Sequence, residues 1–316
     1  MESPKEIMRF AVAEVQKSSS RVRINAEDFI SKIPGEVIFE ILQRESKKYP
    51  KLDFSKEQVE ESILEKINKD FPQITTQKDV IDKSEMIAKY YDKLLRDDLI
   101  KELSKVKLEN ASGQFFDGFN PPDGWAWIGI IYPTTASVVV ESAINASFFT
   151  NAHFGQNDDG EKSNAFRHSV WNALSVGGMR SLGYSRSTSW DNVRTVTSAY
   201  ESVGVSPSWS SFIFPGFMSI FGDINIIQKR GESNAMDLNN NLIGRTYMHH
   251  NMGFWPWQTP SAGAIVAEMF TKANNIGFNS NQNSILMIYH PNIDEAWERL
   301  YVWPYDDDYR ELVKLR

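Results

Sequence analysis

The chain has 316 residues, of which 41% are hydrophobic and 24% charged, and this composition excludes a wholly disordered protein. Its net charge of −7 argues against a protein that binds nucleic acid through phosphate contacts, so no nucleic-acid partner is expected. The absence of cysteine excludes disulfides, thiolate zinc sites, iron–sulfur clusters and a cysteine nucleophile.

The first residues, MESPKE, do not combine a basic segment with an apolar run, so the sequence shows no cleavable secretory signal. The most apolar stretch, residues 125–140, is interrupted by proline, threonine and serine. It is shorter than the roughly 20 apolar residues of a membrane-spanning helix. We therefore expect a soluble protein that is cytoplasmic or exported by a route that needs no cleaved signal.

The composition changes near residue 110. Residues 1–110 contain 21 basic and 22 acidic residues and a single glycine, whereas all nine tryptophans lie beyond residue 124. Turn-forming residues at 110–124 mark the boundary. The sequence predicts a charged helical domain over 1–110 and an aromatic- and glycine-rich helical domain over 111–316. The fold class is therefore mainly α: a helical bundle, then a larger helical domain with long irregular loops.

Two apolar stripes at helical spacing run through the first part. They comprise Val59, Ile63, Ile67 and Phe71, and then Ile87, Tyr90 with Tyr91, Leu94 with Leu95, and Leu99, which Leu103 extends. A helical bundle with a solvated charged face is the favoured interpretation, and a docking or delivery segment is the alternative.

The first polar cluster lies in residues 164–174, on a predicted helix that begins after Ser163 and ends at Gly177 and Gly178. One face of this helix would carry a histidine among amide and aromatic side chains: Asn164, His168, Trp171 and Asn172. This histidine is either part of a site or a partly buried residue whose ring nitrogens are satisfied by the amides. Both interpretations stay open.

Two further clusters follow along the chain. A predicted helix over 189–203, ending at Gly204, would carry Arg194 and Glu201 beside its apolar stripe. In residues 236–245, one helical face would hold Asp237, Asn240, Asn241 and Gly244. Three consecutive asparagines weaken a helix because their side chains compete for the backbone, so they indicate a ligand contact or a polar network.

These motifs resemble a bacterial domain family of unknown function that occurs in cell-surface and polymorphic-toxin-like proteins. The resemblance rests on N-A-F-R-H-x-x-W-N-A-L, a helix ending in glutamate, and M-D-L-x-N-N-x-x-G-R, and it covers roughly residues 150–250. That family usually has histidine at the positions of Tyr200 and Asn239, so only His168 of its three histidines is kept here. If those histidines are metal ligands, this copy has lost most of its imidazole coordination.

No cofactor is predicted, because asparagine and neutral tyrosine are weak ligands for zinc-like ions. A divalent metal is the weaker alternative. On a straight helix Asn239 would lie about 200° from Asp237 and could not share its face. Either the site uses Asp237, Asn240 and Asn241, or the segment is not a regular helix.

Residues 205–234 form an aromatic segment between the second and third motifs. It contains Trp209, Phe212, Phe214, Phe217 and Phe221. A helical hairpin that closes the core is the favoured interpretation. The alternative is a lid or patch that contacts an apolar partner or a lipid surface.

We therefore expect a hydrolase-like domain of toxin or effector type, with an ester or phosphodiester substrate, a lipid being one candidate. His168, Glu201 and Asp237 are the predicted catalytic residues. Substrate binding is assigned to Asn164, Arg167, Asn172, Arg194, Asn240, Asn241 and Arg245. The alternatives are a catalytically inactive copy that binds protein or lipid, and a structural protein whose polar clusters are buried networks.

Overall fold

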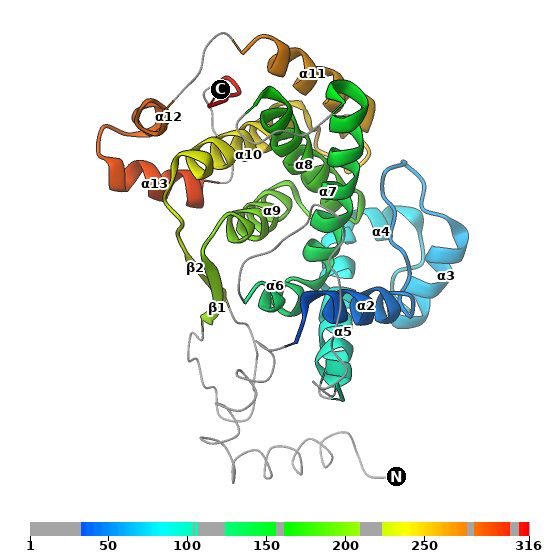
Figure 1. The fold of residues 1–316 in the computed structure, drawn as a ribbon. Coiled ribbons are helices and arrows are strands. Elements are labelled where there is room, and N and C mark those ends of the chain that lie inside the picture. The colour runs from blue at the N-terminus through cyan, green and yellow to red at the C-terminus, as the bar shows by residue number, and fades with distance from the viewer. Residues whose placement is uncertain are drawn as a thin grey trace.

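The computed structural model describes residues 33–103, 105–106, 124–155, 161–208, 223–276, 281–303 and 310–315. Within these ranges lie twelve helices and one two-stranded sheet, so the protein is mainly α, as predicted (Figure 1). No described helix has both the length and the apolar character that crossing a membrane would require.

The charge-rich part folds into four described helices: α2 (Gly35–Ser46), α3 (Glu61–Asp70), α4 (Gln77–Asp82) and α5 (Ser84–Leu103). The predicted stripes are confirmed in part: Ile63 and Ile67 of α3 and Leu95 and Leu99 of α5 are buried, whereas Tyr90 is exposed. These side chains share one hydrophobic core with later helices. The predicted domain boundary lies almost entirely outside the described residues, so the division of the chain stays a prediction.

Five helices follow: α6 (Ala126–Ile131), α7 (Pro133–Phe154), α8 (Lys162–Ser181), α9 (Arg186–Tyr200) and α10 (Glu232–Asn251). The last three of them carry the polar clusters. The helix α7 begins at Pro133 and ends at Phe154, and it is followed by Gly155, whose φ of +73° suits glycine. Side-chain caps begin five other helices, α4, α9 and the three after α10: Thr76, Ser185, Ser261, Asn281 and Asn292.

Two predicted helix ends were wrong. The helix α8 does not stop at Gly177 and Gly178 but continues to Ser181. A Cβ on Gly178 would lie 2.7 Å from Val138 Cγ1 of α7, so this glycine permits close helix packing rather than ending the helix. The helix α9 ends at Tyr200, and Gly204 begins a strand.

That strand, β1 (Gly204–Ser208), pairs antiparallel with β2 (Asp223–Ile227), with Gly204 opposite Ile227. The two strands form a narrow ribbon between α9 and α10 (Figure 1). Residues 209–222 lie outside the described residues, and with them all five aromatic side chains of the predicted patch: Trp209, Phe212, Phe214, Phe217 and Phe221.

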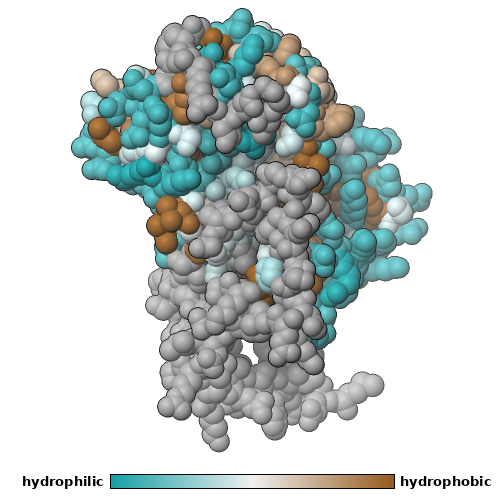
Figure 2. All heavy atoms as spheres, in the orientation of Figure 1, coloured by the Kyte–Doolittle hydropathy of each residue, from teal (hydrophilic) through white to brown (hydrophobic). Residues whose placement is uncertain are grey.

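The last described helices are α11 (Ala262–Asn274), α12 (Gln282–Tyr289) and α13 (Ile293–Val302). A second, smaller core joins α10, α12 and α13 with Val313 near the C-terminus. On the face seen in Figure 2, the described surface is mostly hydrophilic and its hydrophobic side chains form small separate groups.

The helices α8 and α10 cross at close range. A Cβ on Gly244 of α10 would lie 2.1 Å from the carbonyl oxygen of Ser169 in α8, so only glycine fits there without a shift of backbone. This crossing sets the distance between the motif that contains His168 and the motif that contains Asp237.

We expect Gly244→Ala to destabilise the protein by about 2 kcal/mol or more, because the methyl group forces α8 and α10 apart. The matched control is Gly263→Ala in α11, where the nearest other atom would lie 3.9 Å from the added Cβ. There the higher helix propensity of alanine predicts a neutral or slightly stabilising effect. Urea unfolding measures both, and equal free energies of unfolding for the two variants would contradict the close crossing.

Candidate functional site

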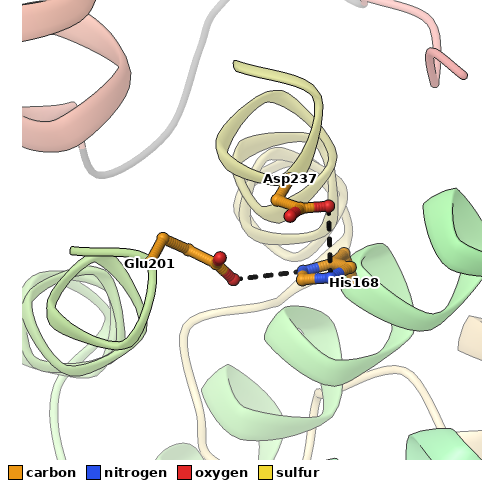
Figure 3. A group of neighbouring side chains, drawn as sticks. All are labelled: His168, Glu201 and Asp237. Atoms are coloured by element: carbon orange, nitrogen blue, oxygen red, sulfur yellow. Dashed lines mark ion pairs between the residues drawn. The ribbon is translucent and has the colours of Figure 1, made fainter. Parts of the chain in front are cut away.

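The three residues predicted as catalytic lie side by side. His168 comes from α8, Glu201 follows the last residue of α9, and Asp237 comes from α10 (Figure 3). One nitrogen of His168 and one oxygen of each carboxylate all lie within 4.8 Å of one another. Three segments that are distant in sequence therefore place one imidazole between two carboxylates.

On one edge of the ring, His168 Nδ1 lies 3.1 Å from Asn241 Oδ1 and 3.3 Å from Glu201 Oε1. The orientation of the Asn241 amide is fixed, because its Oδ1 accepts from Asn172 Nδ2 at 2.6 Å and its Nδ2 donates to Glu201 Oε1 at 3.4 Å. Since both neighbours of Nδ1 are hydrogen-bond acceptors, Nδ1 carries a proton.

On the other edge, His168 Nε2 lies 3.1 Å from Arg167 Nη2 and 3.3 Å from Asp237 Oδ1. A guanidinium only donates, so the contact with Arg167 requires a lone pair on Nε2. The carboxylate of Asp237 instead favours a proton on Nε2. The neutral and the cationic imidazole thus each have a partner at this nitrogen.

The pKa of His168 reflects these opposing neighbours. Burial lowers it, the carboxylate of Asp237 raises it, Arg167 lowers it and Glu201 raises it. The carboxylates prevail, and the pKa of His168 lies above its ordinary value of 6.5.

Burial differs across the cluster. The exposed fraction of the side chain is 2% for His168, 7% for Glu201 and 14% for Asp237. Arg167 is half-buried. Asp237 and Arg167 are therefore the more exposed neighbours of the ring, although the Asp237 Oδ1 that faces Nε2 is itself buried.

Glu201 is fixed through its main chain as well. Its carbonyl oxygen accepts from Asn234 Nδ2 at 2.9 Å and from the Tyr301 hydroxyl at 3.0 Å. The sequence analysis did not find Asn234 or Tyr301, because no local pattern links them to Glu201. They hold the end of α9 against α10 and α13.

Asn172 and Arg245 support the cluster from within. Asn172 Oδ1 accepts from Thr197 Oγ1 at 3.0 Å and from Arg245 Nη1 at 2.7 Å, while Arg245 Nη2 donates to the Trp303 carbonyl at 3.2 Å. Burial and, to a smaller extent, the neighbouring Arg194 lower the pKa of Arg245 to about 9. Arg245, predicted to bind substrate, is fully buried among these groups.

The three consecutive asparagines point to different places on a regular helix. Asn241 joins the cluster, whereas Asn240 donates to the Val313 carbonyl at 2.9 Å and accepts from its amide at 3.0 Å. Asn239 Oδ1 accepts from the Tyr289 hydroxyl at 2.5 Å. Asn240, predicted to bind substrate, therefore holds the C-terminal segment. Of the two alternatives for residues 236–245, a regular helix is the one that the structure shows.

Two other predicted binding residues lie on the same helices as the cluster. Asn164 is buried one helical turn before His168 on α8. Arg194 of α9 is partly buried, with its Nε 4.0 Å from Asp191 Oδ1.

His168, Glu201 and Asp237 have the ligand types that a divalent cation takes. Position 239 faces Tyr289, and the ring of Tyr200 packs edge-on against Trp171 at 5.1 Å. Asn239 and Tyr200 thus each contact a residue outside the three-residue cluster. A cation at the imidazole would have to replace Arg167 at Nε2 or Asn241 at Nδ1.

A cavity of about 870 Å³ lies elsewhere, between α2, α5, α7 and α8. Its lining includes Leu42, Tyr91, Val138 and Leu182 and contains none of the three predicted catalytic residues.

The raised pKa of His168 predicts a pH-dependent contribution to stability. The imidazolium between two carboxylates stabilises the fold fully below about pH 6.5, and this contribution is lost as the pH rises through the raised pKa. We expect the difference in unfolding free energy between wild type and His168→Gln to shrink as the pH rises from about 5.5 to about 8.5. Urea unfolding measures it, with His250→Gln as a surface-histidine control, and a difference that grows with pH would contradict the assignment.

Comparison with known proteins gives a match for one part of the chain. No curated protein and no solved structure matches it. Residues 126–276, which contain α6 to α11, the ribbon and all three residues of the cluster, match the model of a family described as a domain of unknown function (DUF6973).

Proposed function

We propose that the protein is a hydrolase of toxin or effector type, which cleaves an ester or phosphodiester substrate at His168. The observation that carries the proposal is the orientation of the ring. Asn241 and Glu201 hold the proton on Nδ1, so Nε2, which faces Asp237 and Arg167, is the nitrogen that acts as base.

In this mechanism His168 Nε2 takes a proton from a water molecule. The water oxygen attacks the phosphorus or the carbonyl carbon, and the bond to the leaving oxygen breaks. The leaving oxygen then takes the proton from His168, which restores the neutral ring. Glu201 stabilises the imidazolium through Nδ1, and Asp237 orients the water through Oδ1, 3.3 Å from Nε2.

The second candidate is a catalytically inactive copy that binds protein or lipid. The 2% exposure of the His168 side chain favours it, because a buried polar network also satisfies the ring nitrogens without any reaction. Binding would then use the proposed apolar partner surface in residues 205–234.

Hydrolysis of p-nitrophenyl acetate and of bis-p-nitrophenyl phosphate separates the two candidates. We expect His168→Gln to reduce kcat/KM on the active substrate by about 100-fold or more. Glu201→Gln, which keeps an oxygen near Nδ1 but loses its charge, should reduce it less. The control is Arg44→Gln, an exposed residue paired with Glu102.

A wild-type protein that hydrolyses neither compound faster than a correctly folded His168→Gln would contradict the hydrolase and favour the binding module. Circular dichroism and the melting temperature of each variant show whether a loss of rate is a loss of fold.

A further inference from the structure

Arg167 covers the nitrogen that the proposed mechanism uses as base. Its Nη2 lies 3.1 Å from His168 Nε2, and because a guanidinium only donates, it occupies the lone pair of that nitrogen. A base whose lone pair is taken cannot accept a proton from water. Arg167 must therefore release Nε2 before the reaction begins.

The release of Arg167 depends on the charge of the substrate. The guanidinium of Arg167 leaves the imidazole readily only when a stronger hydrogen-bond acceptor is offered. An anionic oxygen is such an acceptor. A neutral carboxylic ester carries no negative charge until its transition state, so it cannot draw Arg167 away beforehand. A phosphodiester carries its charge in the ground state, and two of its oxygens match the guanidinium fork.

We infer that the site takes a phosphodiester, and that Arg167 exchanges its contact with His168 Nε2 for one with the phosphate and so frees the base. The inference rests on the proposed hydrolase function, and it decides between the two substrate classes that the residue types alone leave open.

The positions of the other charged groups agree with this exchange. Arg167 is half-buried and lies on the more exposed side of the cluster, whereas Arg245 is fully buried and bonded to Asn172 and Trp303. The carboxylates of Glu201 and Asp237 repel an anion. The positive charge of Arg167 beside Nε2 counteracts the repulsion between these carboxylates and a phosphate, so phosphate binding depends on Arg167.

Binding of dimethyl phosphate tests the inference without turnover, with methyl acetate as the neutral counterpart. By isothermal titration calorimetry, the wild type should bind dimethyl phosphate and not methyl acetate. Arg167→Gln should weaken this binding by about tenfold or more. Arg167→Lys keeps the charge but not the fork and should fall between them. Arg44→Gln is the surface control and should bind as the wild type does.

Equal binding of dimethyl phosphate by folded Arg167→Gln and wild type would overturn the inference, as would a wild type that does not bind it. If Arg167→Gln fails to fold, Arg167→Lys takes its place, and equal binding of dimethyl phosphate by Arg167→Lys and wild type would overturn the inference.

The outcomes also separate this inference from the proposed function. Binding that depends on Arg167, without hydrolysis of any substrate, would leave the phosphate site standing and contradict the hydrolase. Hydrolysis of p-nitrophenyl acetate that depends on His168 but not on Arg167 would keep the hydrolase and contradict the phosphodiester.

Discussion

The amide of Asn241 is the contact on which the cluster depends. It accepts from Asn172 of α8, lies 3.1 Å from His168 Nδ1 and donates to Glu201 at the end of α9. One side chain of α10 therefore ties three helices together and sets which ring nitrogen is protonated. If the amide were reversed, its oxygen would face a carboxylate and its NH₂ group would face Asn172 Nδ2 and His168 Nδ1. The contacts with Glu201 and Asn172 would be lost, and Nδ1 would have to accept a hydrogen bond in place of donating one.

Close packing of α8 and α10 keeps Asn241 within reach of its partners. The missing side chain of Gly244 lets α10 approach the backbone of Ser169, and Asn172 is in turn held by Arg245 and Thr197. Buried polar groups arranged in this way have a single satisfied geometry. The cost of burying them is offset only when every partner is present, so the same network that orients His168 also contributes to the specificity of the fold.

The sequence predicted the helical class and the residues that meet, because helical spacing places His168 with Asn172 and Asp237 with Asn241 on common faces. It did not predict that the three consecutive asparagines bind different partners. Asn240 binds the Val313 backbone 73 residues away, a contact that no local pattern encodes. The length of α8 was missed for a related reason, since Gly178 serves tertiary packing and was interpreted as a helix stop. The cluster and its neighbours are also held by α13 and by the C-terminal segment, which contact Glu201 and Asn240. Both of these segments lie outside the motifs.

The tautomer of His168 tests the central claim most directly, and the ¹⁵N chemical shifts of its two ring nitrogens report it. At a pH above the raised pKa, the account predicts a proton on Nδ1 and an unprotonated Nε2 that accepts from Arg167. In Asn241→Leu, which removes the acceptor, this preference should weaken. A neutral ring protonated on Nε2 in the wild type would contradict the account. That nitrogen would then have no lone pair, so it could neither accept a hydrogen bond from Arg167 nor act as the base.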